Sequence, residues 1–173
     1  MKDIKEIVKR RVIFLVTFLV SFFIFMWTAP KVQAHLPKSK SPEVRLHHGI
    51  TALLWIDKYK DRFTSKRQML NTQRGHEWLF YSSFDKLGYY DPFMCIYIKE
   101  RHPRQGWATN TGNGYYGGLQ MDWSFLTTYG PKFFERWGTA NNWPKWAQLY
   151  TGYTAVISGR GFGPWPNTRQ GCV

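Results

Sequence analysis

Apolar residues along the chain follow two patterns, a continuous run near the N-terminus and a helical periodicity further on. Residues 12–27 form a run of sixteen positions without a charge, rich in Phe, Val, Ile and Leu. Beyond it, apolar residues recur every three or four positions, which is the spacing of an amphipathic helix. Helices are predicted at residues 50–67, 69–84, 93–101, 122–129 and 142–157, with a short turn or helix at 132–137. The pattern therefore predicts a small, mainly α domain.

One segment, residues 107–120, interrupts this helical pattern with the sequence WATNTGNGYYGGLQ. It holds four glycines, two asparagines and two adjacent tyrosines, and Gly and Asn favour turns and positive φ. A tight Gly-rich turn or hairpin is therefore predicted here. Aromatic faces beside amide groups suit a sugar ring, because its C–H patches stack and its hydroxyls need donors and acceptors.

An acidic residue, Glu100, ends the helix predicted just before this turn. Helical spacing puts it on the same stripe as Ile96 and Tyr97. A carboxyl group leading into a sugar-binding turn predicts acid catalysis on a glycan. The alternative is an ordinary helix-end glutamate paired with Lys99 or Arg101.

The run Thr111–Gln120, TGNGYYGGLQ, resembles the signature of the transglycosylase-like domain of resuscitation-promoting factors, a lysozyme-like family that acts on peptidoglycan. Three more features fit: Cys95 shortly before the acidic residue, the stretch GFGPWPNT at 161–168, and Cys172 close to the end. The resemblance covers roughly residues 93–173. It implies a lysozyme-like architecture (mainly α, α+β) of three or more helices, with a Gly-rich hairpin lining a glycan cleft.

The resemblance also implies roles for individual residues. Glu100 is the candidate catalytic acid, although in the commonest family form the acid follows the cysteine directly. The stretch 101–105 further lengthens the path to the turn. The candidate substrate-binding or cleft-shaping residues are Trp107, Thr111, Asn113, Tyr115, Tyr116 and Gln120. For Trp107 and the two tyrosines, packing in the core is the alternative interpretation.

A second carboxylate would decide the mechanism, because glycoside hydrolases usually need two. The nearest candidate, Asp122, precedes a helical run and is expected to cap it. A single acid suffices for a lytic transglycosylase, in which the 6-hydroxyl of MurNAc attacks its own C1 and leaves a 1,6-anhydro end. Two alternatives stay open: a muramidase that uses Asp122, and a non-catalytic module that binds wall glycan or signals.

The N-terminus has the pattern of an export signal. Residues 1–11 carry five Lys and Arg side chains, and the uncharged run follows. Cleavage after Ala34 is predicted, which gives a secreted or cell-wall protein. The alternative is an uncleaved anchor over residues 12–29, close to the length that spans a bilayer. Either way the remaining chain is expected outside the cytoplasm.

The rest of the chain divides into three predicted parts. Residues 35–48 hold two prolines with several Lys and Ser and are predicted as an exposed linker. Residues 49–88 are a helical extension of unknown role, either a stalk or a segment packed on the domain. Residues 89–173 are the expected catalytic domain.

The formal net charge is +13, which suits a polyanionic partner such as nucleic acid, an anionic membrane or an acidic cell wall. The charges are scattered and no nucleic-acid motif occurs. The expected partners are therefore peptidoglycan glycan strands, with other wall hydrolases as candidates. No nucleic acid is expected, and membrane contact is expected only through the N-terminal segment.

The only two cysteines, Cys95 and Cys172, predict a disulfide, since an exported chain meets oxidising conditions. Closing a loop of this length stabilises by about 4.5 kcal/mol in the chain-entropy model. No cofactor is expected. The histidines show no ligand spacing with either cysteine, so no metal site is expected.

Overall fold

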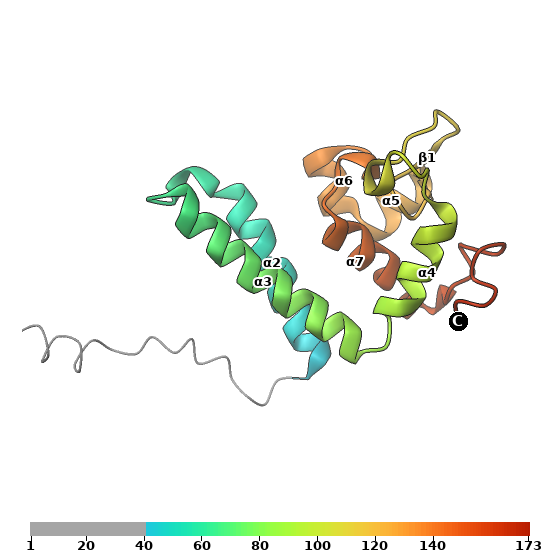
Figure 1. Ribbon diagram of the computed structural model, residues 1–173, viewed down its shortest axis with the longest axis horizontal. Coiled ribbons are helices and arrows are strands. Elements are labelled where there is room, and N and C mark those ends of the chain that lie inside the picture. Colours follow the sequence, from blue (N-terminus) through green and yellow to red (C-terminus); the bar gives the residue numbers. More distant parts are fainter. Residues whose placement is uncertain (1–40) are drawn as a thin grey trace, which may run out of the picture. The chain divides into compact units, whose positions relative to one another are not determined.

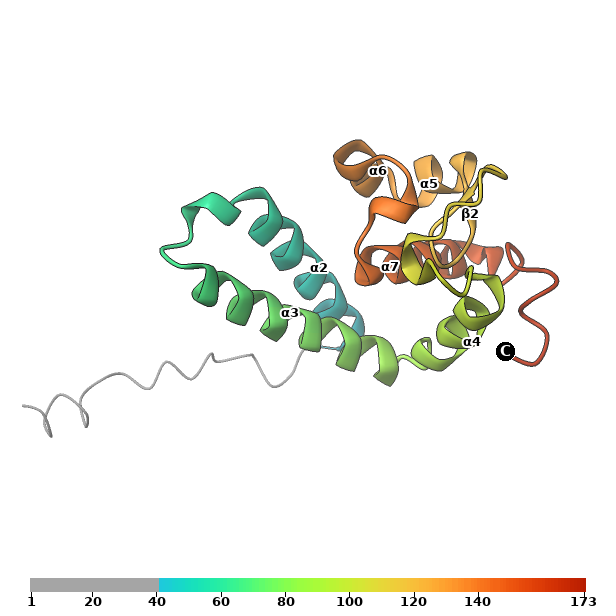
Figure 2. The ribbon, with the colours of Figure 1, turned by 45° about the horizontal axis from the view of Figure 1, so that its top comes forward.

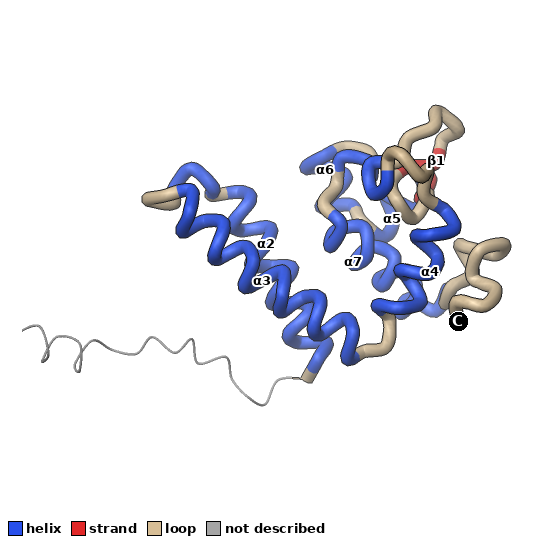
Figure 3. The backbone as a smooth tube through the Cα atoms, in the orientation of Figure 1, coloured by secondary structure: helices blue, strands red, loops and turns tan. Residues whose placement is uncertain are grey.

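A computed structural model describes residues 41–173. The predicted signal or anchor, residues 1–34, lies outside the described residues, as does the start of the predicted linker. In chain order the elements are α2 (Pro42–Lys58), α3 (Lys66–Lys86), α4 (Tyr90–Glu100), β1 (Tyr115–Tyr116), β2 (Met121–Asp122), α5 (Trp123–Tyr129), α6 (Pro131–Trp137) and α7 (Lys145–Ala155). The described residues are mainly helical, as predicted, with a two-stranded sheet formed by β1 and β2 (Figures 1 and 3).

Helix α2 begins earlier than the sequence pattern predicted. Ser41 is its N-cap, where the side-chain oxygen accepts a hydrogen bond from the Val44 backbone N–H at 3.4 Å, and Pro42 fits the first turn. Leu46 is fully buried. The linker predicted to reach residue 48 was therefore wrong from residue 42 onward, because a proline and a capping serine started a helix.

Helices α2 and α3 form an antiparallel helical hairpin (Figures 1 and 2). The predicted continuous helix over 50–67 was wrong, because α2 ends at Lys58 and Ser65 caps a new helix by accepting from the Gln68 N–H at 3.2 Å. The two helices approach closely at Gly49, where an added Cβ would lie 3.4 Å from the backbone of His76 and Phe80.

The helical hairpin shares its core with the rest of the described chain. Leu46 and Ile50 from α2 and Phe84 from α3 belong to one buried cluster with Phe93 of α4 and Tyr153 of α7. The described residues, 41–173, belong to one compact unit. The predicted boundary near residue 88 is therefore no break in packing, and the extension packs on the domain instead of forming a stalk.

Helix α7 is central to the second half of the fold. Most of its residues are buried: Trp146, Ala147, Gln148, Leu149, Thr151, Gly152, Tyr153 and Ala155. At Gly152 an added Cβ would lie 2.5 Å from the ring of Phe93, so α4 and α7 pack closely there. The segment after α7 returns to α4, where the predicted Cys95–Cys172 disulfide is present with a Cα–Cα distance of 5.5 Å.

Among residues 41–173, the structure has no helix with both the length and the apolar character needed to cross a membrane.

Candidate functional site

The segment with the family resemblance forms the predicted Gly-rich hairpin. Tyr115 pairs with Asp122 and Tyr116 with Met121 in antiparallel register. At the turn between them, Gln120 has a φ of 48°, which is uncommon for a residue other than glycine. Its side-chain amide donates to the Gly117 carbonyl at 2.8 Å. The side chain of Gln120 therefore helps to hold the turn.

The loop before β1 is shaped by two asparagines. The Asn110 side-chain oxygen accepts from the Gly112 N–H, and that of Asn113 accepts from the Tyr115 N–H, each at 3.1 Å. Asparagine side chains commonly hold turns in this way. Thr111 is exposed in the same loop. Of the predicted glycan contacts, Asn113 therefore has a local structural role, and Thr111 lies open to a ligand.

The buried Gln148 of α7 holds the β-hairpin in place through side-chain hydrogen bonds. Its side-chain oxygen accepts from the Gly118 N–H at 2.8 Å, and its amide nitrogen lies within 3.1 Å of the carbonyl oxygens of Trp107, Ala140 and Trp143. An added Cβ on Gly117 would lie 2.4 Å from the same oxygen. Sequence reasoning missed this residue. A single Gln inside an apolar helical run was the available signal.

The Trp107 side chain packs against its neighbours instead of projecting into solvent. Its ring stacks on Tyr97 with centroids 4.1 Å apart and an interplanar angle of 5°. Both rings lie against Gly118, where a Cβ would come within 2.8 Å of either. Tyr116 is half-buried and packs against the core, whereas Tyr115 is 47% exposed. The packing interpretation therefore fits Trp107 and Tyr116 better than Tyr115.

Glu100 is the last residue of α4 and is half-buried. The Thr168 hydroxyl donates to its carboxyl oxygen at 2.6 Å. The neighbouring Lys99 ammonium donates to the backbone carbonyls of Thr168 and Gln170 at 3.1 and 2.6 Å. Together with the disulfide, these bonds hold the C-terminal segment against the end of α4. Thr168 lies in the GFGPWPNT stretch, but sequence reasoning gave it no role.

The alternative interpretation of Glu100 is pairing at the helix end, with Arg101 as one partner. The Arg101 guanidinium lies over the Tyr97 ring at 5.3 Å and donates to the Pro103 carbonyl at 3.3 Å. Its Nε is buried without a hydrogen-bond partner. The two cations beside Glu100 are thus engaged with backbone carbonyls and a ring, and Thr168 is the side chain that contacts the carboxyl.

A small pocket of about 190 Å³ lies beside the β-hairpin. We call it the Gln120 pocket, and it is lined by Tyr115, Gln120, Met121, Asp122, Ser124, Phe125, Thr128, Tyr129, Arg160, Pro164 and Trp165. Asp122 caps α5 as predicted, since its Oδ1 accepts from the Phe125 N–H at 2.7 Å. Trp165 is buried and donates its indole N–H to the Leu119 carbonyl at 2.7 Å. Glu100 lies outside this lining.

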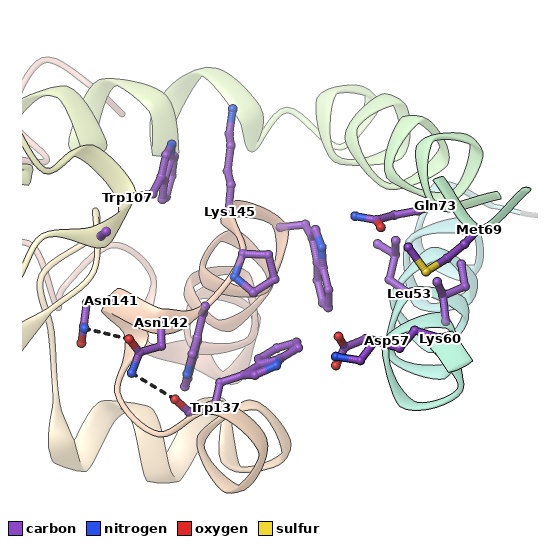
Figure 4. A pocket seen from close by; sticks show the side chains of 15 residues that line it. Leu53, Asp57, Lys60, Met69, Gln73, Trp107, Trp137, Asn141, Asn142 and Lys145 are labelled. Atoms are coloured by element: carbon purple, nitrogen blue, oxygen red, sulfur yellow. Dashed lines mark hydrogen bonds between the residues drawn. The ribbon is translucent and has the colours of Figure 1, made fainter. Parts of the chain in front are cut away.

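A larger cleft of about 580 Å³ lies between the helical hairpin and the rest of the fold (Figure 4). We call it the tryptophan cleft, and it is lined by Leu53, Ile56, Asp57, Lys60, Met69, Gln73, Trp107, Ala108, Trp137, Asn141, Asn142, Trp143, Pro144, Lys145 and Trp146. The predicted contacts are thus divided: Tyr115 and Gln120 line the Gln120 pocket, and Trp107 lines the cleft.

Within residues 41–173, no three His, Cys, Asp or Glu side chains gather in a way that could hold a metal ion. Comparisons of the chain with protein-family models, curated proteins and solved structures found no match.

Proposed function

We propose that this chain is an exported, lysozyme-like enzyme that cleaves the β-1,4 bond between MurNAc and GlcNAc in peptidoglycan as a lytic transglycosylase. One observation carries the proposal. The carboxyl group of Glu100 ends a helix, is held by the Thr168 hydroxyl at 2.6 Å, and leads into the loop and hairpin with the TGNGYYGGLQ sequence.

The proposed reaction needs one carboxyl group. Glu100 in its acid form gives a proton to the glycosidic oxygen as the bond from that oxygen to C1 of MurNAc breaks. The GlcNAc part leaves with a new 4-hydroxyl. The Glu100 carboxylate then takes the proton of the MurNAc 6-hydroxyl, whose oxygen bonds to C1. The product has a 1,6-anhydro end, Glu100 regains its proton, and no water is consumed.

The contact with Thr168 suits a group that alternates between acid and base. A threonine hydroxyl can donate to a carboxylate and can accept from a carboxylic acid. The same contact can therefore orient Glu100 in both protonation states. Lys99 and the disulfide hold the Thr168 backbone in place, which supports a pre-formed geometry.

The Gln120 pocket supports glycan binding close to the hairpin. Tyr115 offers an exposed ring, and Gln120, Ser124 and Thr128 bring polar groups to the same lining. This mixture suits a sugar, whose faces are apolar and whose rim carries hydroxyls. Export is supported by the basic and then apolar N-terminal sequence. The disulfide agrees with an oxidising compartment.

A muramidase is the second candidate, favoured by one observation. Asp122 is exposed and lines the Gln120 pocket. A second carboxylate is therefore available beside the β-hairpin. One of its oxygens already caps α5, which makes a helix-terminal role sufficient to explain it. We therefore rank this candidate below the single-acid reaction.

Replacing the acid tests the proposal. Glu100→Gln keeps the shape of the side chain but cannot supply a proton, so release of soluble fragments from purified peptidoglycan should fall at least about 100-fold. Glu135→Gln, an exposed glutamate on α6, is the matched control and should keep full activity. Thermal unfolding checks that both variants fold. Full cleavage by the folded Glu100→Gln variant would overturn the assignment.

A further inference from the structure

The tryptophan cleft combines aromatic and polar side chains from two distant parts of the chain. Trp107, Trp137, Trp143 and Trp146 line one side, and Leu53, Ile56 and Met69 come from the helical hairpin. Figure 4 shows Trp137 extending toward the helical hairpin, where Asp57 and Lys60 lie. The cleft volume falls within the range of ordinary small-ligand sites, about 300–1,000 Å³.

Three of the polar side chains in the cleft are amides: Gln73, Asn141 and Asn142. Gln73 donates from its nitrogen to Glu77 at 2.9 Å, which leaves its carbonyl oxygen for another partner. Asn142 donates to the Trp137 carbonyl at 3.2 Å and accepts from Asn141 at 3.1 Å. Each asparagine amide has hydrogen-bonding capacity beyond these bonds. Amides beside indole faces suit the hydroxyl and N-acetyl groups of a sugar.

The charges in the cleft favour an acidic ligand. Asp57 forms an ion pair with Arg136 of α6, so its negative charge is matched across the gap between α2 and α6. Lys60 and Lys145 also line the cleft. The Lys145 ammonium donates to the Tyr90 hydroxyl at 3.1 Å and lies over the Tyr90 ring at 4.9 Å. The lining therefore carries a net positive charge.

We propose that the tryptophan cleft is a second glycan-binding site, which holds a strand of β-linked N-acetylhexosamines that carry carboxylate groups. This ligand class rests on the proposed function. The only carboxyl group in the lining is Asp57, which is paired with Arg136, so the site binds a strand and does not cut it. A strand held here stays attached to the protein while Glu100 acts elsewhere.

A peptide helix fits this cleft less well than a glycan. A helix binding in a groove needs a continuous apolar stripe, whereas here Asn141, Asn142 and Lys145 interrupt the tryptophan wall. Pairing with a second copy of the chain would need a surface on that copy that is complementary to the cleft. Dimerisation through the cleft is an outcome that the test below detects.

Binding to a catalytically inactive protein tests the site. The full chain with Glu100→Gln is titrated calorimetrically with two probes: a neutral N-acetylglucosamine hexamer, and soluble, uncrosslinked peptidoglycan strands, which are acidic. Trp137→Ala in this background should weaken both affinities about tenfold or more, as expected for loss of an aromatic anchor. Trp78→Ala removes a 67% exposed tryptophan from α3 outside the cleft and should change neither affinity.

A second variant guards against misfolding, because Trp137 also packs on Phe133 and Trp146. Lys60 is exposed, so Lys60→Glu should leave the fold intact. It should weaken binding of the acidic strands several-fold at low salt and spare the neutral hexamer. Unchanged binding in both Trp137→Ala and Lys60→Glu would overturn the proposal. So would dimerisation of the chain that Trp137→Ala abolishes.

The outcomes show whether the second binding site or the proposed catalysis is wrong. If the native chain cleaves peptidoglycan but the cleft variants bind normally, the second site is wrong and the enzyme stands. If the cleft variants lose binding but the native chain cleaves nothing, the site stands and the proposed catalysis is wrong.

Discussion

The Gln120 pocket and the tryptophan cleft are built in different ways. The pocket, about 190 Å³, is lined by residues 115–129 and 160–165, and backbone turns and a helix cap shape it. The cleft, about 580 Å³, is lined by residues 53–73 and 107–146, and depends on how the helical hairpin packs on the domain. A pocket built by turns holds its side chains closely in place, and the proposed acid, Glu100, lies outside its lining. A cleft between packed elements suits binding of a longer ligand.

Gln148 connects the two. It binds the Gly118 N–H in the β-hairpin and the carbonyls of Trp107 and Trp143, which line the cleft. It is fully buried. A substitution of Gln148 should therefore alter both the Gln120 pocket and the tryptophan cleft. A substitution elsewhere should alter one of them and leave the other unchanged.

The largest effect on stability is expected at Gln148. Gln148→Leu is close in size but removes the side-chain partner of the Gly118 N–H and of the Trp107 and Trp143 carbonyls. The free energy of unfolding should therefore fall by about 4 kcal/mol. Urea denaturation measures it. Gln170→Leu, at an exposed position near the C-terminus, is the control and should stay within about 0.5 kcal/mol of the native value. A similarly small change at Gln148 would contradict its connecting role.

Removing the disulfide should reduce cleavage without reducing glycan binding in the tryptophan cleft. Cys172→Ser opens the closed loop. The free energy of unfolding should fall by about 3 kcal/mol, because disulfides typically contribute less than the chain-entropy model gives. Because the C-terminal segment carries Thr168, cleavage should fall as well, while glycan binding in the cleft persists. Reducing agent should lower the native melting temperature but leave the variant unaffected. Equal loss of cleavage and cleft binding in a folded variant would argue against two independent sites.

The smallest effect on stability is expected from the titration of His76, on the helical hairpin. Burial, with a smaller contribution from His48, lowers the pKa of His76 below its ordinary 6.5. The unfolded chain therefore binds the proton more readily, and stability should fall as pH drops through about 6.5. The loss is complete below the folded-state pKa. His76→Gln should flatten the change in urea midpoint between about pH 7.5 and pH 5.5. An unchanged slope would rule His76 out as the cause.

Features that depend on neighbouring residues could be predicted from the sequence. The predicted helix at 122–129 is α5 with Asp122 as its cap, and that at 93–101 is α4 displaced by a few residues. Caps and periodicity act within one or two turns, so they can be read locally. The Gly-rich hairpin was likewise predicted, because its glycines and asparagines are positioned where the turns need them.

Features that join distant residues could not be predicted in this way. Thr168 reaches Glu100 across 68 positions, and the cleft joins the helical hairpin to residues beyond 107. Neither contact leaves a local pattern. The start of α2 at Pro42 was missed for another reason: Ser41 and Pro42 are common both in linkers and at helix starts. The burial of Leu46 and the Ser41 cap distinguish the two, and both are seen only in the folded structure.

The central claim is that Glu100 alone cleaves the glycan without water. Mass spectrometry of the soluble products from purified peptidoglycan, incubated with the protein, tests it most directly. The account predicts fragments that end in 1,6-anhydro-MurNAc, lighter by one water than hydrolysed ends, and absent with Glu100→Gln. Reducing MurNAc ends would contradict it and would assign the second carboxylate role to Asp122. No soluble product from the folded, disulfide-bonded protein would contradict catalysis altogether.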